Sequence, residues 1–134
     1  MFKIEAIQDI KSQETYANAC GTVAKEGFFA YAMYDMSTNE PMGFAQFDIR
    51  DGVGYIMDLK EAIGKSDFEA IFILGRTTMC FIDSCGVNNI YATADAGDPS
   101  LLKAIGFNAT EDGNFYCDTT GFFDGSCCSG HKAI

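Results

Sequence analysis

The stretch from Gly52 to Phe107 constrains the fold most, because extended and helical patterns follow one another there without a linker. Strands are predicted over 53–59 and 89–94, a long helix over 66–85 and a short helix over 99–105. Apolar residues recur at helical spacing through the long helix, so one of its faces should cover a sheet. They are Phe68, Ile71, Phe72, Gly75, Met79 and Ile82. The order is a βαβα unit.

Capping signals set the ends of both helices. Ser66-Asp67-Phe68-Glu69 is a capping-box pattern, which predicts that the long helix begins with Ser66 as its cap. Gly86 should close that helix. Pro99 suits the first turn of the short helix, which ends at Gly106-Phe107.

Extended patterns dominate the rest of the chain. Runs over 28–34 and 42–49 predict a hairpin, and Asp51-Gly52 makes a tight turn into the strand over 53–59, because Asp-Gly readily takes positive φ. A first strand is predicted over 2–7, a helix over 11–20, and a terminal hairpin over 107–123 that turns near Asp112-Gly113.

Length and charge narrow the class of protein. A chain of 134 residues suits one domain, 1–134, with a cysteine-rich tail over 117–134. The net charge of −10 repels phosphate backbones and anionic lipids, so neither nucleic acid nor membrane is expected as a partner. No secretion signal or membrane-spanning apolar run is found, which predicts a cytoplasmic protein whose six cysteines are thiols.

Taken together, the strands from 28 to 59, the helix over 66–85, the strand over 89–94 and Leu101–Phe107 resemble the core of GNAT-type (acyl-CoA) N-acetyltransferases. The resemblance covers roughly residues 28 to 110, with Asp95 and the closing Gly106-Phe107 as its best marker. It implies an α+β fold with a mostly antiparallel central sheet flanked by helices. It also implies acetyl-CoA or another acyl-CoA as the donor of an acyl group to an amine.

The resemblance also implies where the donor binds. The backbone of Met57, Asp58 and Leu59 would meet the pantetheine arm, and N–H groups at the start of the long helix would meet the pyrophosphate. One alignment of the phosphate loop ends at Gly75-Arg76, with Arg76 as a phosphate cation, although that loop would fall inside the predicted helix.

A second alignment places the loop at Gly64, Lys65 and Ser66, where glycine allows close approach and lysine offers a cation. It fits the predicted helix start. The acidic net charge would not assist an anionic ligand at either place, so the local N–H groups and cations would have to bind it.

Transfer to an amine needs a base, and the resemblance points to Asp58 and Glu61 at the end of the central strand. The position of the usual tyrosine acid is Leu102, and Tyr91 and Ser100 are the nearby replacements. Two functions therefore stay open: an N-acyltransferase, or a catalytically degenerate binding or assembly module of the same fold.

The tail offers a third alternative, a thiol or metal module. Cys117, Cys127, Cys128 and His131 have suitable donor atoms for zinc, but vicinal cysteines ligate one ion poorly, so no metal is assigned. The acyl acceptor is not readable from the sequence. A homodimer is also open, with the aromatic run 28–34 as a candidate interface.

Overall fold

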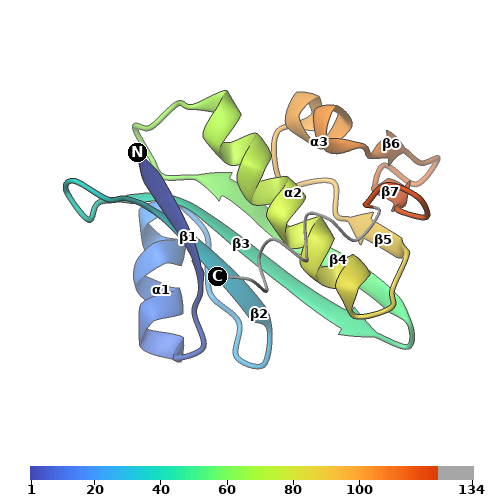
Figure 1. The fold of residues 1–134 in the computed structure, drawn as a ribbon, viewed down its shortest axis with the longest axis horizontal. Coiled ribbons are helices and arrows are strands. Elements are labelled where there is room, and N and C mark those ends of the chain that lie inside the picture. Colours follow the sequence, from blue (N-terminus) through green and yellow to red (C-terminus); the bar gives the residue numbers. More distant parts are fainter. Residues whose placement is uncertain (124–134) are drawn as a thin grey trace.

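The computed structural model describes residues 1–123 and has one seven-stranded sheet with helices on both faces (Figure 1). The strand order is β1-β2-β3-β4-β5-β7-β6, and of the strand pairs within residues 1–123 only β4 and β5 are parallel. The predicted α+β fold with a mostly antiparallel sheet is confirmed. The elements are β1 (Phe2–Ala6), α1 (Ile10–Ala19), β2 (Phe29–Asp35), β3 (Pro41–Arg50), β4 (Val53–Glu61), α2 (Phe68–Ser84), β5 (Asn89–Ala92), α3 (Pro99–Ile105), β6 (Asn108–Ala109) and β7 (Phe115–Asp118).

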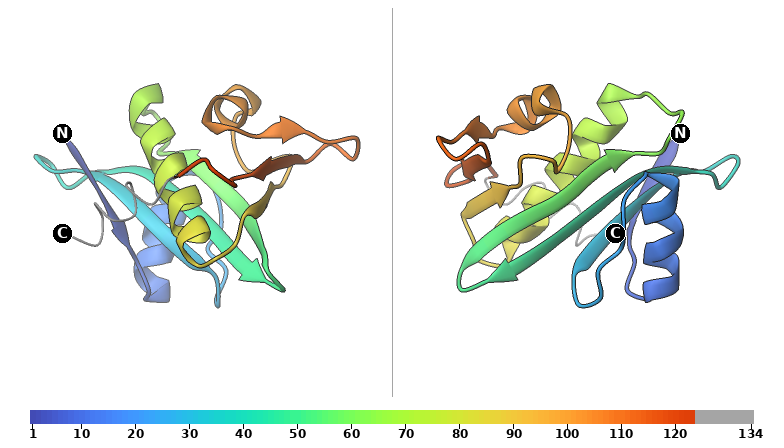
Figure 2. Two further views of the ribbon diagram at one scale, coloured as in Figure 1. Left: turned by 45° about the vertical axis from the view of Figure 1, so that its right-hand side comes forward. Right: turned by 180° about the vertical axis from the view of Figure 1, so that it is seen from behind.

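The two faces of the sheet are covered by different helices, as the views in Figure 2 show. Alternate residues of β3 and β4 point toward α2 and form the main core with Leu74, which is fully buried. The intervening residue Phe44 packs with Ala17 of α1 on the opposite face. Burial of each large apolar side chain stabilises the fold by about 1.5–3 kcal/mol.

The β3–β4 hairpin turns as the sequence predicts. Asp51 and Gly52 have φ values of 52° and 76°, and two positive φ values in succession match the right-handed twist of the strands. The turn fixes the register of β3 against β4, and with it the position of the site described below.

The predicted start of α2 is wrong by one residue. The helix begins at Phe68 with Asp67 as its cap, and the Asp67 carboxylate accepts the Ala70 N–H. The cap moves because the Glu61 carboxylate accepts the Asp67 N–H at 2.6 Å and thereby fixes Asp67 at the end of the loop. Phe68 is 55% exposed, so it leaves the predicted apolar stripe.

Cysteines and membrane segments complete the description of residues 1–123. Cys20, Cys85 and Cys117 are free thiols, whereas Cys80 is disulfide-bonded, so the expectation of thiols is wrong for Cys80. No helix within these residues has the length and apolar character needed to cross a bilayer. They also contain no metal-binding cluster of His, Cys, Asp or Glu, and the tail residues Cys127, Cys128 and His131 lie outside the described part.

Candidate functional site

The centre of the candidate site is the point where β4 and β5 part. Their parallel pairing runs from Val53↔Asn89 to Ile56↔Ala92 and then ends, although β4 continues to Glu61. At the same point Met57 is a bulged residue, because Phe47 pairs with Ile56 and Gln46 pairs with Asp58. A bulge bends its strand and interrupts regular pairing, so β4 turns away from β5 just beyond Ile56.

The segment 95–97 crosses the gap that this parting opens. The Leu59 N–H donates to the Ala96 carbonyl at 2.7 Å, and the Lys60 ammonium donates to the Asp95 carbonyl at 2.7 Å. A Cβ at Gly97 would lie 2.7 Å from the Leu59 carbonyl oxygen, so only glycine permits this approach. The Leu59 amide, which the resemblance assigns to the pantetheine arm, is bonded to the Ala96 carbonyl of the chain itself.

Two hollows flank the parting. The first, which we call the strand-end hollow, has a volume of about 200 Å³ and lies between the end of β4 and the starts of α2 and α3. It is lined by Cys20, Leu59, Lys60, Glu61, Ile71, Gly97, Asp98 and Leu101. Its lining includes the acidic side chain of Glu61 and the basic side chain of Lys60, so a polar chain end could bind there.

The second, the tyrosine hollow, has a volume of about 540 Å³ and includes Met57 and Thr93 at the parting itself. The Tyr55 and Tyr91 rings stack at 6.1 Å, and the Arg50 guanidinium lies 5.1 Å from the Tyr55 ring. The other lining residues are Val53, Ala92, Asp112 and Asn114. The Arg50 guanidinium already lies over the Tyr55 ring, so the Tyr91 ring and the Asp112 carboxylate are the groups of this hollow that favour a cationic ligand.

Asp58 is buried between the strands and the loop that follows α1. It is 8% exposed, and its carboxylate accepts hydrogen bonds from the Thr22 hydroxyl and the Gln46 amide, both at 2.9 Å. Gln46 is fully buried, accepts the Lys25 N–H at 2.7 Å and also donates to the Val23 carbonyl. The carboxylate is thus a fixed acceptor beside the bulge at Met57.

Glu61 lines the strand-end hollow and also borders the N-terminus of α2. Its carboxylate and that of Asp67 accept the N–H groups of Asp67 and Ala70, so two carboxylates occupy the place where the resemblance puts a pyrophosphate. Helix N-termini favour anions, and here the anions are the protein's own.

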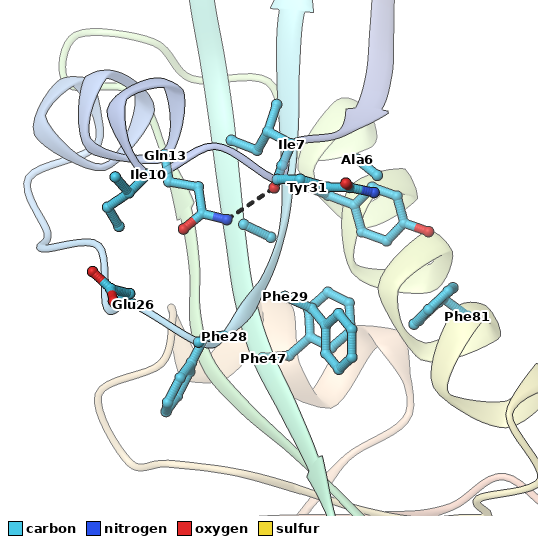
Figure 3. A pocket seen from close by; sticks show the side chains of 13 residues that line it. Ala6, Ile7, Ile10, Gln13, Glu26, Phe28, Phe29, Tyr31, Phe47 and Phe81 are labelled. Atoms are coloured by element: carbon cyan, nitrogen blue, oxygen red, sulfur yellow. Dashed lines mark hydrogen bonds between the residues drawn. The ribbon is translucent and has the colours of Figure 1, made fainter.

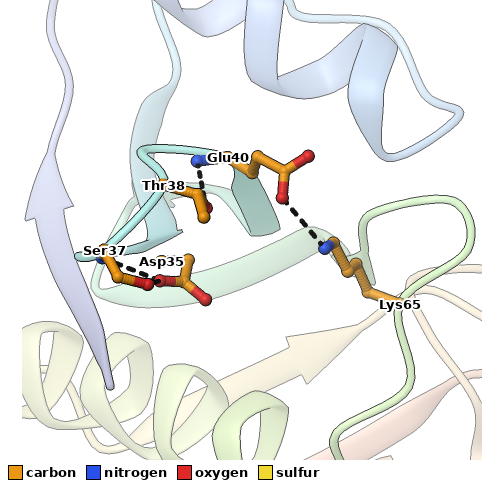
Figure 4. Close-up of polar contacts among 5 residues, drawn as sticks. All are labelled: Asp35, Ser37, Thr38, Glu40 and Lys65. Atoms are coloured by element: carbon orange, nitrogen blue, oxygen red, sulfur yellow. Dashed lines mark hydrogen bonds and ion pairs between the residues drawn. The ribbon is translucent and has the colours of Figure 1, made fainter.

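The loop 62–67 holds the second predicted phosphate segment. Gly64 turns with φ of +87°, and Ser66 is exposed. The Lys65 ammonium lies 3.5 Å from the Glu40 carboxylate in the turn between β2 and β3 (Figure 4). At the start of this turn the Asp35 carboxylate accepts the Ser37 N–H. The cation expected for a phosphate therefore has a partner, at a distance and exposure where an ion pair is weak.

Gly75 and Arg76 lie in the middle of α2, where residues 70–76 are helical rather than a loop. A Cβ at Gly75 would lie 2.9 Å from Ile105 Cδ1, and the Arg76 Nε donates to the Ile105 carbonyl at 2.8 Å. The Arg76 guanidinium also lies 5.0 Å from the ring of Phe72 and 5.0 Å from that of Phe122. Both residues hold α3 against α2.

Leu102, which stands where the family's acid is expected, is fully buried in the main core. Of its two suggested replacements, Tyr91 lies in the tyrosine hollow and is 39% exposed, while Ser100 is exposed at the start of α3. Within residues 1–123, only Tyr91 of these three presents a proton-bearing group to a hollow beside the parting.

Sequence reasoning missed Cys20, Thr22 and Gln46. Burial, followed by the carboxylates of Asp58 and Glu61, raises the pKa of the Cys20 thiol to about 12. This thiol therefore lines the strand-end hollow in its protonated form. Gln46 is a single amide within an otherwise apolar stretch of β3, which is the one signal in the sequence that could have marked this network.

No protein-family model and no curated protein matches the chain. Solved structures do match. A chimera of the spermidine N-acetyltransferase SpeG from Vibrio cholerae has a TM-score of 0.68 at 10% identity and covers 92% of this chain and 98% of its own. The PaiA N-acetyltransferase from Thermoplasma acidophilum, in complex with coenzyme A, has a TM-score of 0.62 at 11% identity, with 85% and 96% covered.

The IAA acetyltransferase from Bacillus cereus has a TM-score of 0.60 at 15% identity, with 83% of this chain and 79% of that one covered. This chain therefore has the fold of the GNAT-type N-acetyltransferases. At such low identities the shared property is the fold, so the activity has to be argued from the site.

Proposed function

We propose that this protein binds an acyl-CoA where β4 and β5 part and transfers the acyl group to an amine held in the tyrosine hollow. One observation carries the proposal: β4 leaves β5 after Ile56, at the bulge of Met57, with a hollow on each side of that point. The match in fold to a structure in complex with coenzyme A supports an acyl-CoA as the kind of donor.

The donor's acylated arm fits the strand-end hollow, and its amides would bond the backbone around Leu59. For this the segment 95–97 must release the Leu59 N–H, which it now holds through Ala96. Exchange of one such hydrogen bond for another changes the free energy little, because each is worth about 0.5–1.5 kcal/mol net. The phosphates would meet the loop of Gly64, Lys65 and Ser66.

The acceptor is an amine that is cationic in water, and the Tyr91 ring together with the Asp112 carboxylate suits that charge, since the Arg50 guanidinium already lies over the Tyr55 ring. The ammonium first loses one proton to water, which frees the lone pair on its nitrogen. The neutral nitrogen attacks the thioester carbonyl, the C–N bond forms, the C–S bond breaks to release the thiolate, and the nitrogen gives up its second proton. A carboxylate takes the proton from the amine, with Asp58 beside Met57 and Glu61 in the strand-end hollow as the two candidates. The thiolate takes its proton from Tyr91 or from water.

The test measures binding and transfer separately. Calorimetric titration with acetyl-CoA should give heat, and an amine panel should release a thiol that a disulfide reagent detects. Glu61→Gln is a clean probe of the base, because the amide oxygen can still accept the Asp67 N–H. Asp58→Asn is similarly clean, since the Thr22 hydroxyl can turn to accept the new amide N–H.

Loss of turnover in one of these variants, with donor binding kept, is the expected result. Absence of any acetyl-CoA binding at millimolar concentration would refute the proposal.

A second function, a binding module of this fold without transfer chemistry, is favoured by two observations. Leu102 replaces the acid, and the Leu59 amide is already bonded within the chain. Acetyl-CoA binding with no turnover of any amine would select this function. Turnover that disappears in Glu61→Gln or Asp58→Asn would exclude it.

A further inference from the structure

The outer edge of β1 is an unpaired strand edge within residues 1–123. β1 is terminal in the strand order and pairs only with β2. The Ile7 N–H donates to the Ala30 carbonyl, and the Met1 carbonyl accepts the Met36 N–H. Because hydrogen-bonding residues alternate along an antiparallel pair, residues 1, 3, 5 and 7 face β2, and Phe2, Ile4 and Ala6 direct their N–H and C=O groups outward.

Among the residues that the structure describes, nothing gives this edge the usual protection against pairing with another strand. Protected edges carry proline, a bulge or charges that repel an incoming strand. β1 has neither proline nor bulge, and its two charges are of opposite sign. Lys3 and Glu5 lie on one face, and their side chains are 54% and 45% exposed.

We propose that two copies of this chain associate through β1, antiparallel, with Ile4 on the two-fold axis. In that register Ile4 pairs with Ile4 of the second copy, and Phe2 pairs with Ala6. The residues that point outward therefore meet one another and can form hydrogen-bonded pairs. The two sheets join into one continuous sheet, and the interface is the same patch on both copies.

The charges select this register over its neighbours. With Ile4 on the axis, Lys3 lies directly opposite Glu5 of the second copy, twice. A shift by two residues in one direction places Lys3 opposite Lys3, and a shift in the other direction places Glu5 opposite Glu5. Like charges directly opposite on neighbouring strands destabilise pairing, whereas opposite charges stabilise it.

A five-residue edge alone makes a small interface, but the same dimer covers an apolar pocket. This pocket, of about 360 Å³, is partly lined by Ala6, with Phe29, Tyr31, Phe47 and Phe81 as its aromatic wall (Figure 3). Phe29 is 47% exposed although its ring lies 5.5 Å from that of Phe47. Exposed aromatic clusters of this kind mark interaction sites.

The proposed register brings the second copy to this pocket. Ala6 and Tyr31 are paired across β1 and β2, and Ile4 and Phe2 pack on the same face of the sheet toward the main core. Phe2 of the second copy stands opposite Ala6, so its ring lies at the mouth of the pocket. The outer edge of β1, the charges of Lys3 and Glu5, and the aromatic wall of the pocket are thus all matched by a second copy of this chain.

The experiment measures the mass of the full chain by sedimentation equilibrium over a wide concentration range. We expect a monomer–dimer equilibrium. Lys3→Glu should weaken the dimer at least tenfold, because it places like charges opposite each other at two points. Lys11→Glu is the matched control: it makes the same change in net charge on the exposed face of α1 and should leave the equilibrium unchanged.

Charge exchange tests the register itself. The double variant Lys3→Glu with Glu5→Lys restores opposite charges across the axis and should recover the dimer. Ala6→Pro removes an outward N–H without breaking the ladder to β2, since proline is tolerated on an edge strand, and should give a folded monomer. Hydrogen exchange at Phe2, Ile4 and Ala6 should slow as concentration rises, which checks the interface without any substitution.

A wild-type chain that stays monomeric at all concentrations would overturn the proposal. So would a dimer that Lys3→Glu and Ala6→Pro leave intact, since another surface would then be responsible.

Discussion

The hydrogen-bond network around Gln46 allows one sharp test of how Asp58 is positioned. Gln46 is fully buried on β3 and makes three contacts, with the Lys25 N–H, the Val23 carbonyl and the Asp58 carboxylate. Gln46→Leu keeps the volume of the side chain close to that of glutamine but removes all three contacts. The Asp58 carboxylate then keeps only the Thr22 hydroxyl as a partner.

The magnitude follows from the contacts. A hydrogen bond to a charged group is worth about 1.5–3 kcal/mol, and each bond to a neutral loop group about 0.5–1.5 kcal/mol. The Lys25 and Val23 backbone groups lie in a loop where water can replace Gln46 as their partner, so these two bonds contribute little to the loss of unfolding free energy. Burial of the leucine returns about 1 kcal/mol. We expect a net loss of about 1–2.5 kcal/mol in the free energy of unfolding.

Urea denaturation of the full chain measures this loss. With a slope of about 2 kcal/mol per molar urea, the midpoint should fall by about 0.5–1.2 M. Gln46→Leu and Asp58→Leu can be combined in a double-mutant cycle. The double variant should lose about 1.5–3 kcal/mol less unfolding free energy than the two single variants lose in sum, because removal of both partners leaves no unpaired charge. Gln13→Leu, which loses one bond to the Ile7 carbonyl, is the control and should be additive with Asp58→Leu.

A loss below about 0.5 kcal/mol, or full additivity of Gln46→Leu with Asp58→Leu, would refute this account of the network. The loop after α1 would then be held in place by other contacts, and Asp58 would be free to adopt other positions as a base.

Three further predictions follow from the site. Gly97→Ala should displace segment 95–97 from β4, because its Cβ would lie 2.7 Å from the Leu59 oxygen; amide exchange at Leu59 should become faster, and an unchanged rate would contradict the contact. Arg76→Ala should lower the free energy of unfolding in urea by about 1–2 kcal/mol and leave the affinity for acetyl-CoA unchanged. If Arg76 instead bound a phosphate of the donor, the variant would bind acetyl-CoA more weakly. The pKa of Cys20 is raised from 9.0 to about 12 in the folded state, so its contribution to stability is present below pH 9.0 and is lost as the pH rises through 12. Cys20→Ala should therefore flatten the alkaline decline of the urea midpoint, and an equal decline in both proteins would contradict it.

The features that the sequence predicted correctly are those set by local patterns. The positive φ values of Asp51 and Gly52, the helix stop at Gly86 and the end of α3 at Gly106 each depend on a few neighbouring residues. The order of strands and helices followed from these signals and the apolar stripe of α2, and it was sufficient to indicate the fold.

The features that were missed depend on contacts between residues far apart in the chain. The Glu61 carboxylate accepts the Asp67 N–H and so makes Asp67 the N-cap of α2, and the Ala96 carbonyl accepts the Leu59 N–H. Gly75 looked like part of a phosphate loop, but its small size serves the close approach of α2 to Ile105. A motif of one glycine and one cation cannot distinguish these roles without the three-dimensional arrangement.

Electrostatics link donor binding to the choice of base in the proposed function. The N-terminus of α2 attracts anions, but Glu61 and Asp67 now accept its N–H groups, and Lys65 is paired with Glu40. A phosphate that binds there must displace the Glu61 carboxylate from the Asp67 N–H. The released carboxylate would remain at the strand-end hollow, next to the thioester, without its hydrogen bond and beside a new anion. Donor binding itself would therefore free a Glu61 oxygen from the Asp67 N–H, and that oxygen could then accept the proton of the amine.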